Sequence, residues 1–341
     1  MSTAWTTGTC ATAAAKAAAL HAAGRLHRGF VDVPLPGGAR AGVEVRSWGG
    51  IRSRPWASVR KPGSDDPDAT RGALVVVSLR RSPTLRFRAG AGVGVVTRAG
   101  LQLPVGEPAI NAGPRAQIAQ ALRETGDDAW RVSVSVAGGE EIARRTFNPR
   151  LGIEGGISIL GSAGVVRPWS VEALAASIDA HMGVVRARGQ ETLVLVPGHM
   201  GERAVANLLP GMECVEVGNA WGDALDRAAR HGFSRLVVVG HPGKLVKLAQ
   251  GQWNTHSSAG SSAAPWARRF LSRTMGRTDA PRLPFADTLE GILEPLEPNA
   301  RRRAASLLAR RVARALRLRA GIESRVVFVD LRGQATGEGE S

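Results

Sequence analysis

Three aspartates, Asp65, Asp66 and Asp68, lie within four positions in the segment DDPD of a chain whose net charge is +16. Clustered carboxylates of this kind can hold a divalent metal ion or accept a proton during catalysis. The calcium-loop spacing with its distal glutamate is missing, so metal binding is not predicted. A solvated turn is the alternative interpretation, because Asp and Pro both favour turns. A general base is the third interpretation of this aspartate cluster.

Three of the seven histidines, His199, His241 and His256, fall in loops that are predicted to face a ligand crevice. His256 belongs to the run Asn254 to Ser257, which places four hydrogen-bonding side chains in a row. A lone histidine is more often structural than catalytic, but a position in such a loop makes the two readings comparable. His256 is a second candidate for the proton acceptor.

The second half of the chain predicts a mainly parallel sheet. Apolar segments rich in β-branched residues recur at 157–160, 192–196, 214–217, 236–239 and 326–329. Amphipathic stretches of helical spacing separate most of them, and this alternation is typical of a sheet covered by helices on both faces. The carboxyl ends of parallel strands meet at one edge, where ligands bind. The residues expected in these strand-end loops are Gly161, Ser162, Gly198, His199, Asn219, Asp223, Gly240 and His241.

The first half predicts an α+β domain. An Ala-rich helix follows a Thr-rich cluster that contains Thr6 and Thr7, and Lys16 is the lone charge within it. The segment is either a capped helix with a snorkelling lysine or an anion site at a helix N-terminus. Residues 30–48 alternate as in a β-hairpin. The expected organisation is an α+β domain over 1–149, an α/β domain over 150–333 and a disordered tail over 334–341.

Bulk composition indicates a globular protein with an anionic partner. Of the 341 residues, 43% are hydrophobic and 22% are charged, and the net charge is 45 − 29 = +16. That excess favours nucleic acid, an acidic membrane, or a polycarboxylate or phosphate ligand. The two cysteines offer neither a disulfide framework nor a four-ligand zinc site. Without a signal-peptide pattern or an apolar run near ~20 residues, we expect a soluble, cytoplasmic protein.

Several motifs together resemble one family of enzymes. The segment FNPRLGIEGGISILG at 147–161 closely resembles the cobalt-precorrin-5B (C1)-methyltransferase family of anaerobic cobalamin synthesis. TTGTC at 6–10, the loop ending DDPD, PVGEPAIN at 104–111 and GHPGKLVKLAQGQWNTHS at 240–257 match it as well. The resemblance implies methyl transfer from S-adenosylmethionine to ring carbon C1 of an anionic, cobalt-containing tetrapyrrole. The cobalt would travel with the substrate, so no protein-bound metal is expected; a homo-oligomer or contact with neighbouring pathway enzymes is possible.

The resemblance also suggests roles for individual residues. The strand-end loop residues named above are expected to bind S-adenosylmethionine, and Asp65, Asp66 or His256 to act in catalysis. The residues expected to bind the tetrapyrrole are Thr6, Thr7, Lys16, Asn148, Arg150, Arg167, Lys244, Lys247, Asn254 and Thr255. The chain departs from the family pattern at 258–265, where a short acidic segment is replaced by SAGSSAAP, and at Ser64, where glycine is expected.

The sequence offers two alternative functions. The segment 299–319 carries eight arginines and could bind nucleic acid, but no recognised nucleic-acid motif accompanies it, so neither nucleic acid nor a membrane is expected as a partner. A dehydrogenase on a similar sheet is disfavoured because the G-x-G-x-x-G fingerprint is missing.

Overall fold

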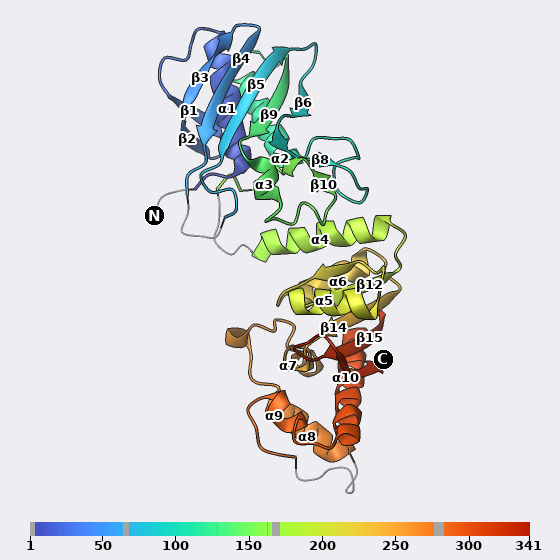
Figure 1. Cartoon of the computed structure of the whole chain (residues 1–341). Helices are drawn as coiled ribbons and strands as arrows, with labels where there is room; N and C mark the ends of the chain where they lie inside the picture. Colours follow the sequence, from blue (N-terminus) through green and yellow to red (C-terminus); the bar gives the residue numbers. More distant parts are fainter. Residues whose placement is uncertain (1–3, 64–67, 128, 162, 166–170, 276–282) are drawn as a thin grey trace. The chain divides into compact units, whose positions relative to one another are not determined.

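The chain forms two compact units, Met1–Val171 and Glu172–Ser341 (Figure 1). The computed structural model describes residues 4–63, 68–127, 129–161, 163–165, 171–275 and 283–341. The domain boundary predicted from the sequence, 149/150, lies before the observed boundary between Val171 and Glu172. The difference arises because Ile153–Glu154 (β10) and Gly156–Ile157 (β11) pair with strands of the first unit.

The first unit is a five-stranded sheet that packs on a buried helix. Its elements are α1 (Thr7–Ala22), β1 (Phe30–Pro34), β2 (Arg40–Glu44), β3 (Ser47–Ile51), β4 (Arg54–Arg60), β5 (Leu74–Arg81), β6 (Arg86–Ala89), β7 (Gly92–Val93), β8 (Val95–Val96), α2 (Ala112–Arg123), β9 (Trp130–Val136), α3 (Gly139–Ala143), β10 and β11. The sheet order is β3-β4-β5-β9-β6. The alanines of α1 are almost all buried, and their small side chains let the helix pack closely on β4, β5 and α2. The predicted hairpin over 30–48 is confirmed by the antiparallel pairing of β1 with β2.

The segment 157–160 was expected to begin the parallel sheet of the second domain, and that expectation is wrong. Within it only Ile157 is in a strand, and β11 pairs in parallel with β7 of the first unit. The two backbones approach so closely that a Cβ on Gly156 would lie 2.1 Å from the carbonyl carbon of Gly92. Gly92 also has a φ of 76°, so both glycines are required by the contact.

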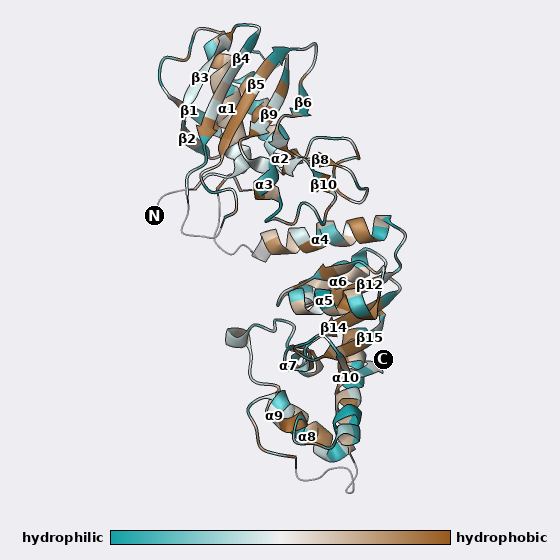
Figure 2. Cartoon of the chain, viewed as in Figure 1, coloured by the Kyte–Doolittle hydropathy of each residue, from teal (hydrophilic) through white to brown (hydrophobic). Residues whose placement is uncertain are grey.

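The second unit is the predicted mainly parallel sheet. Its elements are α4 (Val171–Ala187), β12 (Thr192–Val196), α5 (His199–Leu208), β13 (Cys214–Glu216), α6 (Trp221–Arg230), β14 (Arg235–Gly240), α7 (Pro242–Leu245), η1 (Val246–Gln250), η2 (Ser257–Ala259), α8 (Ala264–Thr274), α9 (Leu289–Leu293), α10 (Pro298–Ala320), β15 (Glu323–Val329) and β16 (Ala335–Glu340). The order is β13-β12-β14-β15-β16, with parallel pairing from β13 to β15. The strands β12, β14 and β15 are hydrophobic along most of their length (Figure 2), as strands buried on both faces must be.

The last residues of the chain were predicted to be a disordered tail, and the structure contradicts this prediction. β16 runs antiparallel to β15 and packs on α10. Its glycines make this possible, because a Cβ on Gly339 would lie 2.2 Å from the backbone nitrogen of Arg310. The strand was not predicted because its sequence is polar. It packs on α10 through glycines, which have no side chain to place there.

The Arg-rich helix α10 is partly explained by intramolecular contacts. Arg319 pairs with Asp226 at 2.6 Å, and Arg317 pairs with Glu323 at 3.0 Å. Arg301 donates to the backbone oxygens of Glu294 and Leu296 ahead of the helix. Among the described helices, none combines the length and the apolar character needed to cross a lipid bilayer.

Replacing Gly339 by Val tests the packing of β16. The side chain would clash with the backbone of α10, so we expect the free energy of unfolding to fall by about 1–3 kcal/mol. Urea unfolding followed by circular dichroism measures this. Glu340→Ala, an exposed position on the same strand, is the control and should leave stability within about 0.5 kcal/mol. Equal stability of the two variants would mean that the terminal strand is not packed.

Candidate functional site

The parallel sheet of the second unit places three polar loops at one edge. β12 lies between β13 and β14, so the chain leaves β12 in one direction and later returns to its other side. This reversal is a topological switch point, where open α/β sheets bind ligands beyond the carboxyl ends of the strands. Gly198 follows β12, Asn219 follows β13 and His241 follows β14. The sequence prediction that these loops share an edge is confirmed by the parallel pairing.

A pocket of about 480 Å³ lies beyond the end of β14. Its lining comes from the turn after β14, from η1 and η2, and from the beginnings of α8 and α9. The lining residues are His241, Gly243, Lys247, Ser257, Gly260, Ser262, Ala263, Ala264, Asp287, Thr288, Leu289 and Glu290. The volume falls within the roughly 300–1,000 Å³ of small-molecule sites.

An imidazole–carboxylate pair forms one wall of the pocket. His241 Nε2 lies 2.9 Å from Glu290 Oε1, and His241 Nδ1 accepts a hydrogen bond from the backbone N–H of Gly243 at 3.3 Å. Since Nδ1 accepts, a neutral imidazole carries its proton on Nε2. Glu290 Oε1 is nevertheless buried without a hydrogen-bond partner among the described residues. Asp287 adds a second carboxylate to the lining. With two carboxylates against the one ammonium group of Lys247, the lining is acidic by one charge, although the chain is strongly cationic.

The predicted ligands Lys247, Asn219 and Thr255 hold the wall of the pocket together. Lys247 is buried, and its Nζ donates to the backbone oxygen of Thr255 at 3.3 Å. Thr255 in turn donates through its hydroxyl to Asn219 Oδ1 at 3.2 Å, and through its N–H to the Asn219 carbonyl. Asn254 pairs with Ala220 in an isolated bridge and accepts from the N–H of His256. These contacts fix the loop after β13 to the segment that ends at Ser257.

His256, the predicted base, lies outside the lining of this pocket. Its side chain is exposed, and Nδ1 lies 2.7 Å from the hydroxyl of Ser258. Asp223, predicted to contact the cofactor, forms an ion pair with Arg227 at 2.7 Å on the same helix. Gly240 packs its Cα against the ring of Pro197, where a Cβ would lie 2.9 Å away. Asp223 and Gly240 thus have structural roles in the described contacts.

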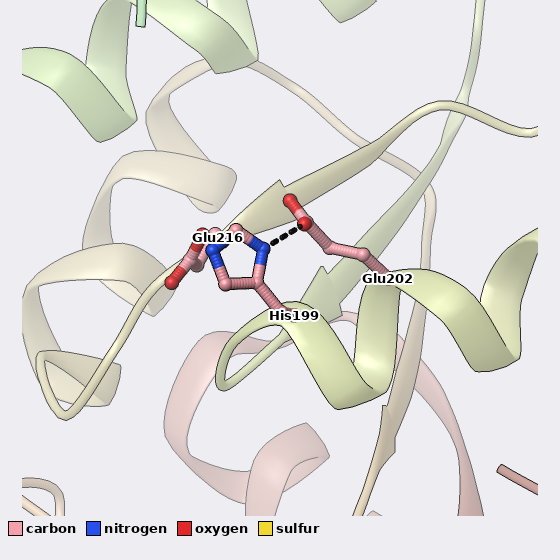
Figure 3. Close-up of side chains that lie close together, drawn as sticks. All are labelled: His199, Glu202 and Glu216. Carbon is pink, nitrogen blue, oxygen red and sulfur yellow. Dashed lines mark hydrogen bonds and ion pairs between the residues drawn. The ribbon is translucent and has the colours of Figure 1, made fainter. Parts of the chain in front are cut away.

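A second polar cluster lies at the ends of β12 and β13 (Figure 3). His199 Nδ1 lies 2.9 Å from Glu202 Oε2, and the imidazole sits between the carboxylates of Glu202 and Glu216. One ligand atom from each residue lies within 4.8 Å of the others, a spacing compatible with a divalent cation. The His199 side chain is 80% exposed, and exposed acidic groups often gather without an ion. The cluster alone does not establish a metal site.

Lys244 lies close to this cluster. Burial lowers the pKa of its ammonium group, Lys247 lowers it further, and the carboxylate of Glu216 opposes the change. Lys244 and Lys247 were both expected to bind the tetrapyrrole, and the Lys247 ammonium group donates to the Thr255 carbonyl.

In the first unit, the predicted substrate-binding residues make structural contacts. Thr6 caps α1 by accepting from the N–H of Thr9, and Thr7 exchanges hydrogen bonds with the backbone of Leu160. Lys16 pairs with Glu124 and donates to the carbonyl of Asp32. The capped-helix reading of this segment accounts for these contacts.

The segment around Asn148 shows the same pattern. Asn148 is buried and donates to the Gly156 carbonyl at 3.0 Å, while its side-chain oxygen accepts from Ser158. The guanidinium of Arg150 lies over the Phe147 ring. Gly161 contacts Thr6, where a Cβ would lie 2.2 Å from the hydroxyl oxygen. Four predicted site residues, Asp65, Asp66, Ser162 and Arg167, lie outside the described residues.

Asp68 is the one described aspartate of the acidic run 65–68. Its carboxylate pairs with Lys61, which is only 2% exposed, and accepts from the N–H and hydroxyl of Thr70. Burial raises the pKa of Asp68, but the hydrogen bonds from Lys61 and Thr70 outweigh it, so the net pKa is lowered. Nearby, burial raises the pKa of the Cys10 thiol to about 12, so this cysteine is protonated at neutral pH and is a poor nucleophile.

The sequence pattern did not predict four carboxylates of these clusters, Glu290, Asp287, Glu216 and Glu202. Glu216 had a signal, because it is an acidic residue in an otherwise apolar strand end. Glu290 lies in the first turn of the short helix α9, and nothing local distinguishes it from any other acidic first-turn residue. Its contact with His241 depends on tertiary packing.

Comparisons with known proteins agree on one family. The CbiD family model matches residues 1–168. A cobalt-precorrin-5B C(1)-methyltransferase from Syntrophotalea carbinolica is 43% identical over 311 residues, which is 90% of this chain and 87% of that protein. One from Rubrobacter xylanophilus is 48% identical over 74% of this chain and 68% of that protein. A crystal structure of the cobalamin biosynthesis protein (cbiD) from Archaeoglobus fulgidus is 28% identical, with a TM-score of 0.40 over 74% of this chain and 81% of that one.

Asp68→Asn tests the buried ion pair. The change leaves the Lys61 ammonium group without its carboxylate, so we expect the free energy of unfolding at pH 7 to fall by about 3 kcal/mol. A carboxyl whose folded-state pKa is lowered contributes stability above its unfolded pKa and loses it as pH falls, so the difference should shrink below about pH 4. Urea titrations at pH 7 and pH 3 measure both values. Glu44→Gln, an exposed position on β2, should change little; a pH-independent difference for Asp68→Asn would contradict this assignment.

Proposed function

Because the chain belongs to the CbiD family, we propose that it methylates C1 of cobalt-precorrin-5B in cobalamin biosynthesis, using S-adenosylmethionine as the methyl donor. The observation that carries this proposal is the 43% identity to a cobalt-precorrin-5B C(1)-methyltransferase across nine-tenths of the chain. The roles that we propose for individual residues rest on the geometry of the second unit.

The acidic pocket beyond β14 suits the methyl donor. S-Adenosylmethionine carries two cationic groups, the sulfonium and the amino group, and the Glu290 and Asp287 carboxylates provide complementary charge. Ala263, Ala264 and Leu289 supply apolar surface for the adenosine. The anionic tetrapyrrole would be repelled by the same carboxylates, so we place it outside this pocket.

The reaction requires alignment more than an activated side chain. In the methyl transfer, the S–CH₃ bond breaks as the C1–CH₃ bond forms, the tetrapyrrole supplies the electron pair, and S-adenosylhomocysteine leaves. Holding donor and acceptor in line contributes roughly 7–11 kcal/mol to lowering the barrier. The cobalt belongs to the substrate. Asp65, Asp66 and His256 stay our candidates for a proton acceptor, and the His241–Glu290 pair positions the donor.

The remaining predicted contacts belong to the same proposal. Gly198 and His199 at the end of β12 lie at the switch point, where the donor could extend from the pocket. Lys244, half-buried near Glu216, is a candidate for the donor's carboxylate or for a substrate carboxylate. Lys247, Asn219, Asn254 and Thr255 act by fixing the pocket wall.

Glu290→Gln tests the donor site. Removing the carboxylate charge while keeping the shape should weaken S-adenosylmethionine binding about tenfold, because a charged partner of the cationic donor is lost. Isothermal titration calorimetry measures the dissociation constant, and anaerobic incubation with methyl-labelled donor and ring-contracted cobalt-precorrin measures turnover by mass spectrometry.

Glu294→Gln is the matched control, since Glu294 is exposed at the end of the same helix. It should bind the donor as the unmodified chain does. If Glu290→Gln also binds normally while the chain places label on C1, the reaction stands and the donor lies elsewhere. Failure of the unmodified chain both to bind the donor and to transfer label would reject the proposed function.

A further inference from the structure

An exposed aromatic ring and a fixed guanidinium lie together beside the acidic pocket. The Phe285 side chain is 87% exposed, and Arg268 lies over its ring with 3.5 Å between the guanidinium carbon and the ring centroid. Arg268 Nε donates to the backbone oxygen of Leu283 at 3.1 Å. The hydrogen bond and the cation–π contact hold the guanidinium in one position.

The Arg268–Phe285 pair has groups that can still bind a ligand. Other arginines of this unit, such as Arg227 and Arg319, form ion pairs with aspartates. No carboxylate of the described residues pairs with Arg268, so its terminal nitrogens retain donors that an anion can accept. Leaving a phenylalanine exposed gives up the stabilisation that its burial would provide. The surface thus combines a flat apolar face with a planar cation that no carboxylate of the described residues neutralises.

The position of the pair connects it with the pocket. Arg268 lies on α8, whose first residue Ala264 lines the pocket, and Phe285 precedes the lining residue Asp287 by two positions. Helices α8 and α9 contact each other and lie side by side in Figure 1. A ligand on the Arg268–Phe285 pair would therefore lie next to a donor bound in the pocket.

We propose that Arg268 and Phe285 form a docking site for the tetrapyrrole substrate, in which Phe285 stacks on the macrocycle and Arg268 binds a peripheral carboxylate. This inference rests on the proposed function for the identity of its ligand. The chemistry selects that ligand because a tetrapyrrole is a flat apolar ring bordered by carboxylates, complementary to a phenyl face beside a planar cation. The two ligands then bind at separate places: the cationic donor in the acidic pocket and the anionic acceptor on the Arg268–Phe285 pair.

Equilibrium titration of the cobalt tetrapyrrole, followed by its visible absorbance, tests the site without requiring turnover. We expect Phe285→Ala and Arg268→Gln each to raise the dissociation constant of the tetrapyrrole about tenfold. Phe285→Leu should recover part of the loss, because it restores apolar area, and Arg268→Lys should recover less than half, because the planar bidentate geometry is lost. The dissociation constant of S-adenosylmethionine should stay unchanged in all four variants.

Leu331→Ala is the control, since this side chain is 71% exposed on the turn between β15 and β16, away from the pocket lining. It should bind the tetrapyrrole normally. Unchanged tetrapyrrole binding by Phe285→Ala and Arg268→Gln overturns the inference, even when the chain methylates C1. A change of oligomeric state in Phe285→Ala, with tetrapyrrole binding intact, also overturns it and makes the surface an interface between copies. Weakened tetrapyrrole binding in a chain that transfers no methyl group would support the docking site while rejecting the proposed reaction.

Discussion

The second unit depends on one constraint, that four neighbouring strands run in the same direction. Parallel strands need long connections, and these connections place all strand-end loops at one edge. The loops cannot hold their positions by themselves, because loop backbones lack regular partners. Here the contacts among Asn219, Lys247 and Thr255 provide those partners. The residues with the most distinctive sequence pattern therefore build the wall against which a ligand can bind.

Charge is distributed unevenly in this cationic chain. The α10 arginines are exposed or paired on the surface, whereas the pocket beyond β14 contains two carboxylates. A protein that acted only as a binder of polyanions would gain nothing from an acidic pocket. The separation fits the methyl transfer that we propose, in which the cationic donor and the anionic acceptor bind different surfaces.

The parallel sheet could be predicted because its strands are continuous apolar runs, and its loops because they follow those runs. The partner of His241 could not, because Glu290 is distant in sequence and its position follows from how α9 packs. β16 escaped prediction for the opposite reason: its contact with α10 demands the absence of side chains, and glycines among glutamates resemble a tail. The short strand β11 escaped because an apolar run does not reveal which unit it joins.

The same physical argument explains why predicted site residues in the first unit make internal contacts. Thr, Asn and Lys side chains readily form hydrogen bonds. A sequence motif does not show whether the partner is a ligand or the backbone. For Asn148 the structure identifies internal partners, because the side chain is buried and hydrogen-bonded to the Gly156 carbonyl and to Ser158. By contrast, Arg268 attracts no attention in the sequence, yet it is fixed, unpaired by the described carboxylates and stacked on an exposed ring. Unused binding capacity becomes visible only after internal partners have been assigned, and it separates residues that hold the fold from those that can hold a ligand.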